Sequence, residues 1–274
     1  MILFVFEGQK REPELYKTVK TLFLPKEPKD ILCTYKSNIY SLYSKLKDLD
    51  IFENTDNSAD TVSILNEILL SNNDHTLENI VASDISEIYL FFDYDFHHNR
   101  GDFNKNNSLI KEMLEYFNDE TNSGKLYINY PMVDSIRYTK LLPDANYSNY
   151  RISRDKCNDF KNLTHEFSPY KSFDHILVSN NKNESEDKQL KHNEDVKKNW
   201  LYLIDMNLCK ANLICKDSYN LPESLSDIAQ SIIYINQLSK YVNTSVCEVS
   251  ILNAFPIFIA DYIGFSKIKN FLFF

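Results

Sequence analysis

The stretch EIYLFFDYDFHH, residues 87–98, decides the fold class because a continuous apolar run ends in two aspartates. A run that is apolar at successive positions is typical of a central strand covered on both faces. We therefore expect a strand over residues 87–95. Alternate side chains of a strand share one face, so Asp93 and Asp95 are expected to point the same way. In open α/β sheets, ligands bind at the carboxyl ends of such strands.

The stretch ILFVFEGQKREPEL, residues 2–15, has the same form, with an apolar strand that runs directly into Glu7. If this strand and the aspartate strand are neighbours in one sheet, Glu7 joins Asp93 and Asp95 at its carboxyl edge. Carboxylates that lie so close raise one another's pKa unless a cation binds between them. Mg²⁺ prefers oxygen ligands and also binds substrate phosphate, and Mn²⁺ is the alternative ion. These three residues are therefore the predicted metal ligands.

Strand and helix patterns alternate along the first 142 residues, which is the signature of an α/β fold with a mostly parallel sheet. The expected strands cover residues 2–6, 30–35, 87–95 and 125–130, and the expected helices cover residues 12–24, 38–52, 61–70, 108–119 and 131–142. The pattern predicts a first domain over residues 1–142.

Beyond residue 143 the pattern changes to that of a helical elaboration. An irregular polar stretch is followed by the charged segment 180–198, which we expect to be an exposed loop that leads into a helix. Further helices are expected at residues 199–216, 224–242 and 249–264. The second predicted region, residues 143–274, is mainly helical and packs on the first.

The composition excludes several classes of function. With a net charge of -9 and a pI near 5.2, the chain cannot coat nucleic acid through a broad basic face, so such a contact must be local, metal-assisted or supplied by a partner. No P-loop and no G-x-G-x-x-G pattern occurs. Five cysteines without a C-x-x-C pair favour a reduced, cytoplasmic setting over structural zinc. No signal peptide is expected, and the apolar segment 251–265 is too short and too interrupted to span a membrane.

The two acidic stretches, read as FEGQKREPELY and IYLFFDYDFH, resemble the Toprim domain, the catalytic module of topoisomerases, DnaG-type primases and OLD-type nucleases. The opening E-G-x-x-x-E-P and the later YPMVDSI are similar to Toprim proteins of bacterial anti-phage systems, such as the RloB-like proteins and the nuclease subunit of the PARIS system. The resemblance covers about residues 1–140. It implies a Toprim-like, Rossmann-type sheet with a helical C-terminal elaboration.

The resemblance also implies roles for individual residues. Glu7 matches the family glutamate that acts as acid/base or metal ligand, and Asp93 and Asp95 match the metal-binding aspartates. Glu12 and Asp134 match further acidic positions of the related sequences and complete the predicted catalytic set. An acid in the first turn of a helix is also what the helix dipole favours, with no function needed. The neighbouring His97 and His98 are left out of the metal set.

The function that follows from the resemblance is a Mg²⁺-dependent endonuclease that hydrolyses DNA or RNA, such as tRNA, as a toxic effector of anti-phage defence. The implied partners are the nucleic acid and an ATPase subunit that holds the nuclease; a homodimer is also compatible with the sequence. Two alternatives stay open. One is a D-x-D glycosyltransferase, which binds Mn²⁺ and a nucleotide sugar, and the other is a non-catalytic Toprim module that serves assembly.

Overall fold

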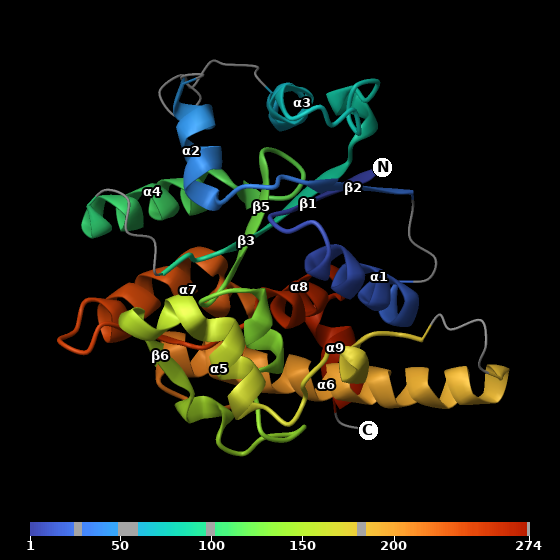
Figure 1. The fold of residues 1–274 in the computed structure, drawn as a ribbon, viewed down its shortest axis with the longest axis vertical. Helices are drawn as coiled ribbons and strands as arrows, with labels where there is room; N and C mark the ends of the chain where they lie inside the picture. Colours follow the sequence, from blue (N-terminus) through green and yellow to red (C-terminus); the bar gives the residue numbers. More distant parts are fainter. Residues whose placement is uncertain (25–28, 49–59, 97–101, 180–184, 273–274) are drawn as a thin grey trace. The chain divides into compact units, whose positions relative to one another are not determined.

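The computed structural model describes two compact units, neither of which is contiguous in sequence (Figure 1). Unit 1 comprises the described residues within Met1–Pro13, Pro28–Asp93 and His98–Tyr127, and unit 2 comprises those within Glu14–Glu27, Tyr94–His97 and Ile128–Phe274. The structure describes all residues except 25–28, 49–59, 97–101, 180–184 and 273–274. The predicted division of the chain into domains at residues 1–142 and 143–274 stays a prediction.

Unit 1 is built on a five-stranded, mostly parallel sheet with the strand order β2-β1-β3-β5-β4. The strands are β1 (Ile2–Phe6), β2 (Asp30–Thr34), β3 (Glu87–Asp93), β4 (Asn118–Asp119) and β5 (Gly124–Asn129), the last two residues of β5 belonging to unit 2. The central strand β1 pairs in parallel with β2 on one side and with β3 on the other. This confirms the predicted α/β class and the mostly parallel sheet.

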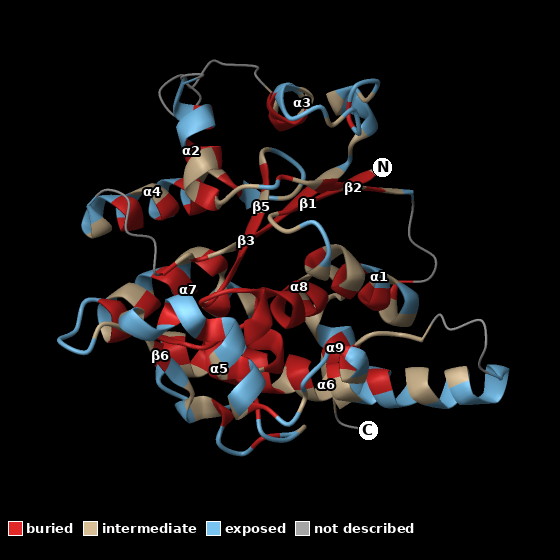
Figure 2. Ribbon diagram, viewed as in Figure 1, coloured by how far each residue is buried: buried red, intermediate tan, exposed pale blue. Residues whose placement is uncertain are grey.

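Aromatic side chains form a large part of the core of this sheet. Phe4 stacks on Tyr89 with ring centroids 5.4 Å apart, and Phe6 lies 5.5 Å from Phe91, which in turn stacks on Tyr127 at 5.3 Å. Cross-strand aromatic pairs of this kind stabilise a sheet beyond the area they bury. The row therefore links β1, β3 and β5, and Figure 2 shows these strands as buried.

The described part of unit 1 also contains the α-helices α2 (Ile39–Asp48), α3 (Thr61–Ser71) and α4 (Phe103–Tyr116). The Tyr43 hydroxyl of α2 donates a hydrogen bond of 2.6 Å to Glu112 of α4. Beside β3, a Cβ at Gly124 would lie 2.9 Å from a methyl group of Leu90, and its φ of +114° also favours glycine, so the chain can pass here only without a side chain.

The start of α4 corrects the predicted helix over residues 108–119. The helix begins at Phe103 because the Asp102 side chain accepts hydrogen bonds from the amides of Asn104 and Lys105, at 2.8 and 3.3 Å. It ends at Tyr116, and the following residues 118–119 form β4 instead. The helix predicted at residues 12–24 is confirmed as α1 (Arg11–Phe23), which begins in unit 1 and continues in unit 2.

Unit 2 contains the predicted C-terminal helices around the long helix α6 (Glu186–Lys216). The others are α5 (Phe160–Phe167), α7 (Gln230–Gln237), α8 (Ala254–Ile263) and α9 (Phe265–Leu272). Helix α8 is buried along most of its length, whereas the first turns of α6 are exposed (Figure 2). Within the core, the Trp200 indole N–H donates to the Ile176 carbonyl at 2.9 Å. No helix among the described residues is long and apolar enough to cross a membrane.

One predicted helix of this part of the chain is wrong, and another begins later than predicted. Residues 131–142 form only a short 3-10 helix, Val133–Arg137, because side chains take the backbone groups that a longer helix would use. The Thr139 hydroxyl donates to the Leu141 carbonyl at 2.7 Å, and the Asp144 carboxylate accepts the Lys140 amide at 2.8 Å.

Residues 249–253 are also not helical. They continue from β7 (Glu248–Ser250), which pairs antiparallel with β6 (Arg151–Ser153), and Leu252 then bridges to Tyr130. Helix α8 starts only after Asn253, whose side chain accepts the Phe255 amide at 3.0 Å. The helix predicted over residues 224–242 is divided into the 3-10 helix Leu225–Ile228, α7 and the π-helix Leu238–Val242.

Charged and polar groups are buried at the centre of unit 2. The Lys210 ammonium, fully buried, donates to the carbonyls of Tyr147 and Tyr150 at 2.8 and 2.7 Å. The Asn207 side-chain oxygen accepts from the Tyr147 hydroxyl and the Asn253 amide, both at 2.9 Å. Burial lowers the pKa of Lys210 well below its usual value. These bonds connect α6 to two distant segments of the chain, residues 147–150 and Asn253.

A candidate metal site at the carboxyl edge of the sheet

Glu7 and Asp93 lie at the same edge of the unit 1 sheet. The register pairs Ile2 with Glu87 and Phe6 with Phe91, so the neighbouring parallel strands β1 and β3 end side by side. The Glu7 side-chain oxygen Oε2 accepts a hydrogen bond from the Asp93 amide at 2.9 Å. The two strands that end in these acids are therefore neighbours in one sheet.

The backbone of Glu7 is held on both sides. Its amide donates to the Phe91 carbonyl of β3 at 3.0 Å, and its carbonyl accepts from the Lys36 amide at 3.1 Å, just beyond β2. Lys36 has a left-handed φ of 61°, and its ammonium lies 3.6 Å from the Asp74 carboxylate. With the side chain bonded to Asp93, three adjacent strand ends together position this glutamate.

Asp95 differs from the prediction that strand alternation aligns it with Asp93. Strand β3 ends at Asp93, and Asp95 has a left-handed φ of 49°, so the pleat that fixes alternation does not extend to it. The turn is anchored by Tyr94, whose amide donates to the Asn129 carbonyl at 3.0 Å and whose ring stacks on Phe96 at 5.3 Å. Asp95 belongs with these residues to unit 2, whereas Asp93 belongs to unit 1.

Glu12 lies over the residue that follows Glu7. Its Oε1 accepts the Gly8 amide at 3.1 Å, and the side chain is only 4% exposed. A Cβ added at Gly8 would lie 2.5 Å from Oε2 of the same carboxylate. A side chain at position 8 would therefore displace the Glu12 carboxylate, a relation that the sequence pattern did not predict. In the sequence, the contact between Gly8 and Glu12 is indicated only by their close spacing.

Asp134 is placed in unit 2, where it forms a buried ion pair. Its Oδ1 accepts from Nε and Nη2 of Arg137 at 3.2 and 2.9 Å, and both residues are 6% exposed. The Arg137 Nη1 donates to the carbonyls of Tyr170 and Lys171, and the guanidinium lies over the Phe173 ring at 5.1 Å. The carboxylate therefore neutralises an arginine that ties the segment 170–173 to the 3-10 helix.

The residues at the sheet edge fit a magnesium ion in donor type. Mg²⁺ is commonly held by one or two carboxylates and completes its shell with water and substrate oxygens. A carboxylate offers about four lone-pair positions, so the Asp93 amide bond is compatible with metal binding by Glu7. Within the described ranges, no group of three or more His, Cys, Asp or Glu side chains is placed closely enough to hold a metal ion. His97 and His98 lie outside the described residues.

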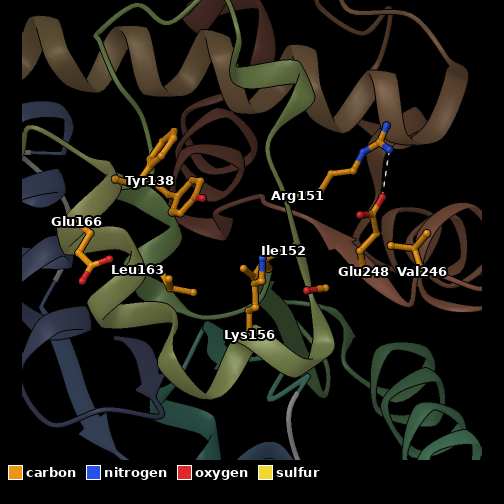
Figure 3. Close-up of a pocket in the computed structure, with 10 residues that line it drawn as sticks. Tyr138, Arg151, Ile152, Lys156, Leu163, Glu166, Val246 and Glu248 are labelled. Carbon is orange, nitrogen blue, oxygen red and sulfur yellow. Dashed lines mark hydrogen bonds and ion pairs between the residues drawn. The ribbon is translucent and has the colours of Figure 1, made fainter.

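A second feature is a groove in unit 2 between α5 and the β6–β7 pair, with a volume of about 600 Å³ (Figure 3). Its charged lining residues are Arg151, Lys156, Glu166 and Glu248, and Arg151 pairs with Glu248 at 3.1 Å. The charges of these four side chains cancel.

The aromatic faces of this groove are already covered. Tyr138 is stacked between Phe160 and Phe167, with centroids 5.3 and 4.3 Å away, and the Lys140 ammonium lies 4.0 Å above the Phe167 ring. Nucleic acid favours positive charge, and single strands also favour open aromatic faces. The groove has neither an excess of positive charge nor an open aromatic face, so we do not assign nucleic-acid binding to it.

Comparisons with protein-family models, with curated proteins and with solved structures give no match. The candidate site is therefore defined by its own geometry: the Glu7 carboxylate is bonded to the Asp93 amide at the ends of two adjacent strands, and the Glu12 carboxylate is bonded to the amide of Gly8, the residue after Glu7.

Proposed function

We propose that the chain is a Mg²⁺-dependent, Toprim-like endonuclease. The observation that carries the proposal is the 2.9 Å bond between the Asp93 amide and Glu7, which places the acids of two distant sequence stretches at one edge of a parallel sheet. The carboxyl edge of an α/β sheet is where such folds bind ligands. Clustered carboxylates with oxygen donors favour a hard divalent cation and, through it, a phosphate.

Each residue has a role in this proposal. Glu7 and Asp93 hold the ion, and Glu7 orients or deprotonates the attacking water. A metal-binding role for Asp95 is carried over from the sequence resemblance alone. When bound, Mg²⁺ supplies charge neutralisation at a non-bridging phosphate oxygen. The hydrogen bond to the Asp93 amide fixes the Glu7 side chain before substrate arrives, and preorganised groups of this kind need little rearrangement during the reaction. The substrate is DNA or RNA, with tRNA among the RNA candidates.

The biological setting rests on the sequence resemblance alone. We propose that the protein is a cytoplasmic effector of anti-phage defence. In this proposal an ATPase partner binds the nuclease and releases it on infection, and the nuclease itself can form a homodimer. The net charge of -9 disfavours a free-standing nuclease and suits one that contacts nucleic acid locally or through a partner.

The test is a cleavage assay in which the purified protein is incubated with RNA or DNA extracted from the host. Separate reactions contain Mg²⁺, Mn²⁺ or a chelator. We expect divalent-dependent cleavage that is lost in Asp93→Asn and Asp95→Asn. Glu115→Gln is the matched control, because Glu115 is an exposed acid of α4 whose carboxylate lies 3.6 Å from the Lys111 ammonium. Cleavage by the two aspartate variants at the wild-type rate would reject the proposal.

A further inference from the structure

The loop between β1 and α1 is closed by one buried carboxylate. Glu12, in the first turn of α1, accepts the Gly8 amide through Oε1, while Oε2 occupies the space where a side chain at position 8 would begin. Both oxygens thus lie against Gly8, and only 4% of the residue is exposed. Gly8 directly follows Glu7, the residue whose side chain accepts the Asp93 amide.

We propose that Glu12 is a positioning residue and not a metal ligand: by binding the Gly8 amide it sets the direction in which Glu7 leaves the sheet. This rests on the proposed function in one respect, since it assumes that Glu7 and Asp93 bind the ion. The backbone of Glu7 is bonded to Phe91 and Lys36, which fixes the strand end. The amide of Gly8 is bonded to Glu12, so the backbone is held by hydrogen bonds both at Glu7 itself and at the residue that follows it.

The two roles make different demands on the side chain. A metal ligand needs the negative charge of the carboxylate, because Mg²⁺ binds charged oxygens preferentially. A hydrogen-bond acceptor for Gly8 needs only an oxygen at the same place, and the amide oxygen of glutamine supplies one. Glu12→Gln therefore separates the roles, whereas Glu12→Ala removes both.

The experiment measures two quantities in each variant: Mn²⁺ affinity by calorimetry, and hydrogen exchange of the Gly8 and Asp93 amides by NMR. For Glu12→Gln we expect both amides to stay protected and the Mn²⁺ Kd to stay within about threefold of wild type. For Glu12→Ala we expect faster exchange and a Kd roughly 10-fold to 100-fold weaker, as for the loss of a group that orients a ligand. Glu14→Gln, an acid in the same helical turn, is the control that tests for effects of charge alone.

The outcomes separate this inference from the proposed function. If Glu12→Gln weakens Mn²⁺ binding as much as Glu12→Ala does, Glu12 is a ligand and the inference is wrong. A Gly8 amide that exchanges freely in the wild type also overturns it. If the wild type binds no Mn²⁺, the proposed site fails, while the exchange of the Gly8 and Asp93 amides still decides whether Glu12 positions the loop. Gly8→Ala should reproduce the fast exchange of Glu12→Ala, since the added methyl displaces the carboxylate.

Discussion

Two buried charges of unit 2 are held differently from two carboxylates of unit 1. In unit 2, Asp134 is neutralised by the Arg137 guanidinium, and the Lys210 ammonium is bonded to two backbone carbonyls. In unit 1, Glu7 accepts a backbone amide from Asp93, and Glu12 accepts one from Gly8. A guanidinium brings a compensating charge to its carboxylate, whereas an amide orients a carboxylate and leaves its charge in place.

This difference distinguishes structural charges from candidate functional ones. Removing one partner of a buried ion pair lowers stability, because the other charge is left buried and uncompensated. A half-buried carboxylate oriented by amides at a sheet edge keeps the charge that a cation requires. The comparison therefore predicts that substitutions in unit 1 lower activity and that substitutions in unit 2 lower stability.

The largest effect is expected from Glu7→Gln. The substitution keeps the size and the hydrogen-bond acceptor of the side chain but removes its charge, so we expect cleavage to fall roughly 10²- to 10³-fold. The midpoint of thermal unfolding should stay close to that of the wild type. A variant that unfolds at a much lower temperature would instead place Glu7 with the structural charges and would break the comparison.

The counterpart in unit 2 is Asp134→Asn, which leaves the Arg137 guanidinium buried without its counter-charge. We expect the free energy of unfolding to fall by roughly 3–5 kcal/mol, measured by urea denaturation. The cleavage rate per folded molecule should be unchanged. Glu166→Gln, which removes an exposed carboxylate of α5, provides the matched control and should leave stability within about 0.5 kcal/mol. Loss of cleavage in a fully folded Asp134→Asn protein would restore this residue to the catalytic set.

Lys210→Met tests the second buried charge of unit 2. Methionine fills a similar volume but cannot donate to the carbonyls of Tyr147 and Tyr150, which are left without that donor. Each carbonyl still accepts one backbone amide, from Tyr150 and Ile251 respectively, so only the two hydrogen bonds of the ammonium are lost and we expect the free energy of unfolding to fall by roughly 1–3 kcal/mol. An unchanged unfolding curve would show that the buried ammonium contributes no net stability.

His175 gives unit 2 a pH dependence with a defined sign. Burial, together with the nearby Arg137 charge, lowers its pKa from 6.5 to about 4, and its ring stacks on Tyr170 at 4.1 Å. The unfolded chain then binds a proton that the folded chain does not. Stability should therefore fall as the pH drops from 6.5 towards 4, by up to roughly 3 kcal/mol.

The control for this prediction is His175→Phe, which keeps an aromatic ring against Tyr170 and removes the titration. Its free energy of unfolding should decline less than that of the wild type over the same pH range. Parallel declines in the two proteins would assign the acid sensitivity to other groups.

The smallest effect is expected in the groove. Because its four charged side chains cancel, Lys156→Ala should change the affinity for nucleic acid by less than about twofold in fluorescence anisotropy. Lys161→Ala, an exposed lysine of α5, serves as the comparison. A Lys156→Ala variant with much weaker binding than Lys161→Ala would move the nucleic-acid contact into this groove.

The sheet and half of the candidate site followed from local sequence patterns. Apolar runs predicted β1 and β3, and the expectation that Glu7 and Asp93 meet depended only on these strands being neighbours. That inference works because parallel strands share a carboxyl edge whatever lies between them in sequence. The prediction that Asp95 points the same way as Asp93 failed because the strand ends at Asp93. Asp95 has a left-handed backbone conformation, which no apolar pattern in the sequence indicates.

The errors in unit 2 have a different origin. Residues 131–142 and 249–253 fit a helical pattern. Their backbone groups bond instead to the Asp144 side chain and to Tyr130 and Tyr150, which are distant from residues 249–253 in sequence. Likewise, an acid in the first turn of a predicted helix is read as functional or dipolar from sequence, and only the fold shows that Asp134 is paired with Arg137. Long-range hydrogen bonds override local propensity at such positions.

The central claim, that Glu7 and Asp93 hold a divalent cation, is tested most directly by a crystal structure of the wild-type protein soaked in Mn²⁺ with anomalous data. The account predicts an anomalous peak about 2.1 Å from carboxylate oxygens of both residues, absent from crystals of Glu7→Gln treated in the same way. An anomalous map with no peak at this sheet edge, or with the ion bound elsewhere, would contradict it.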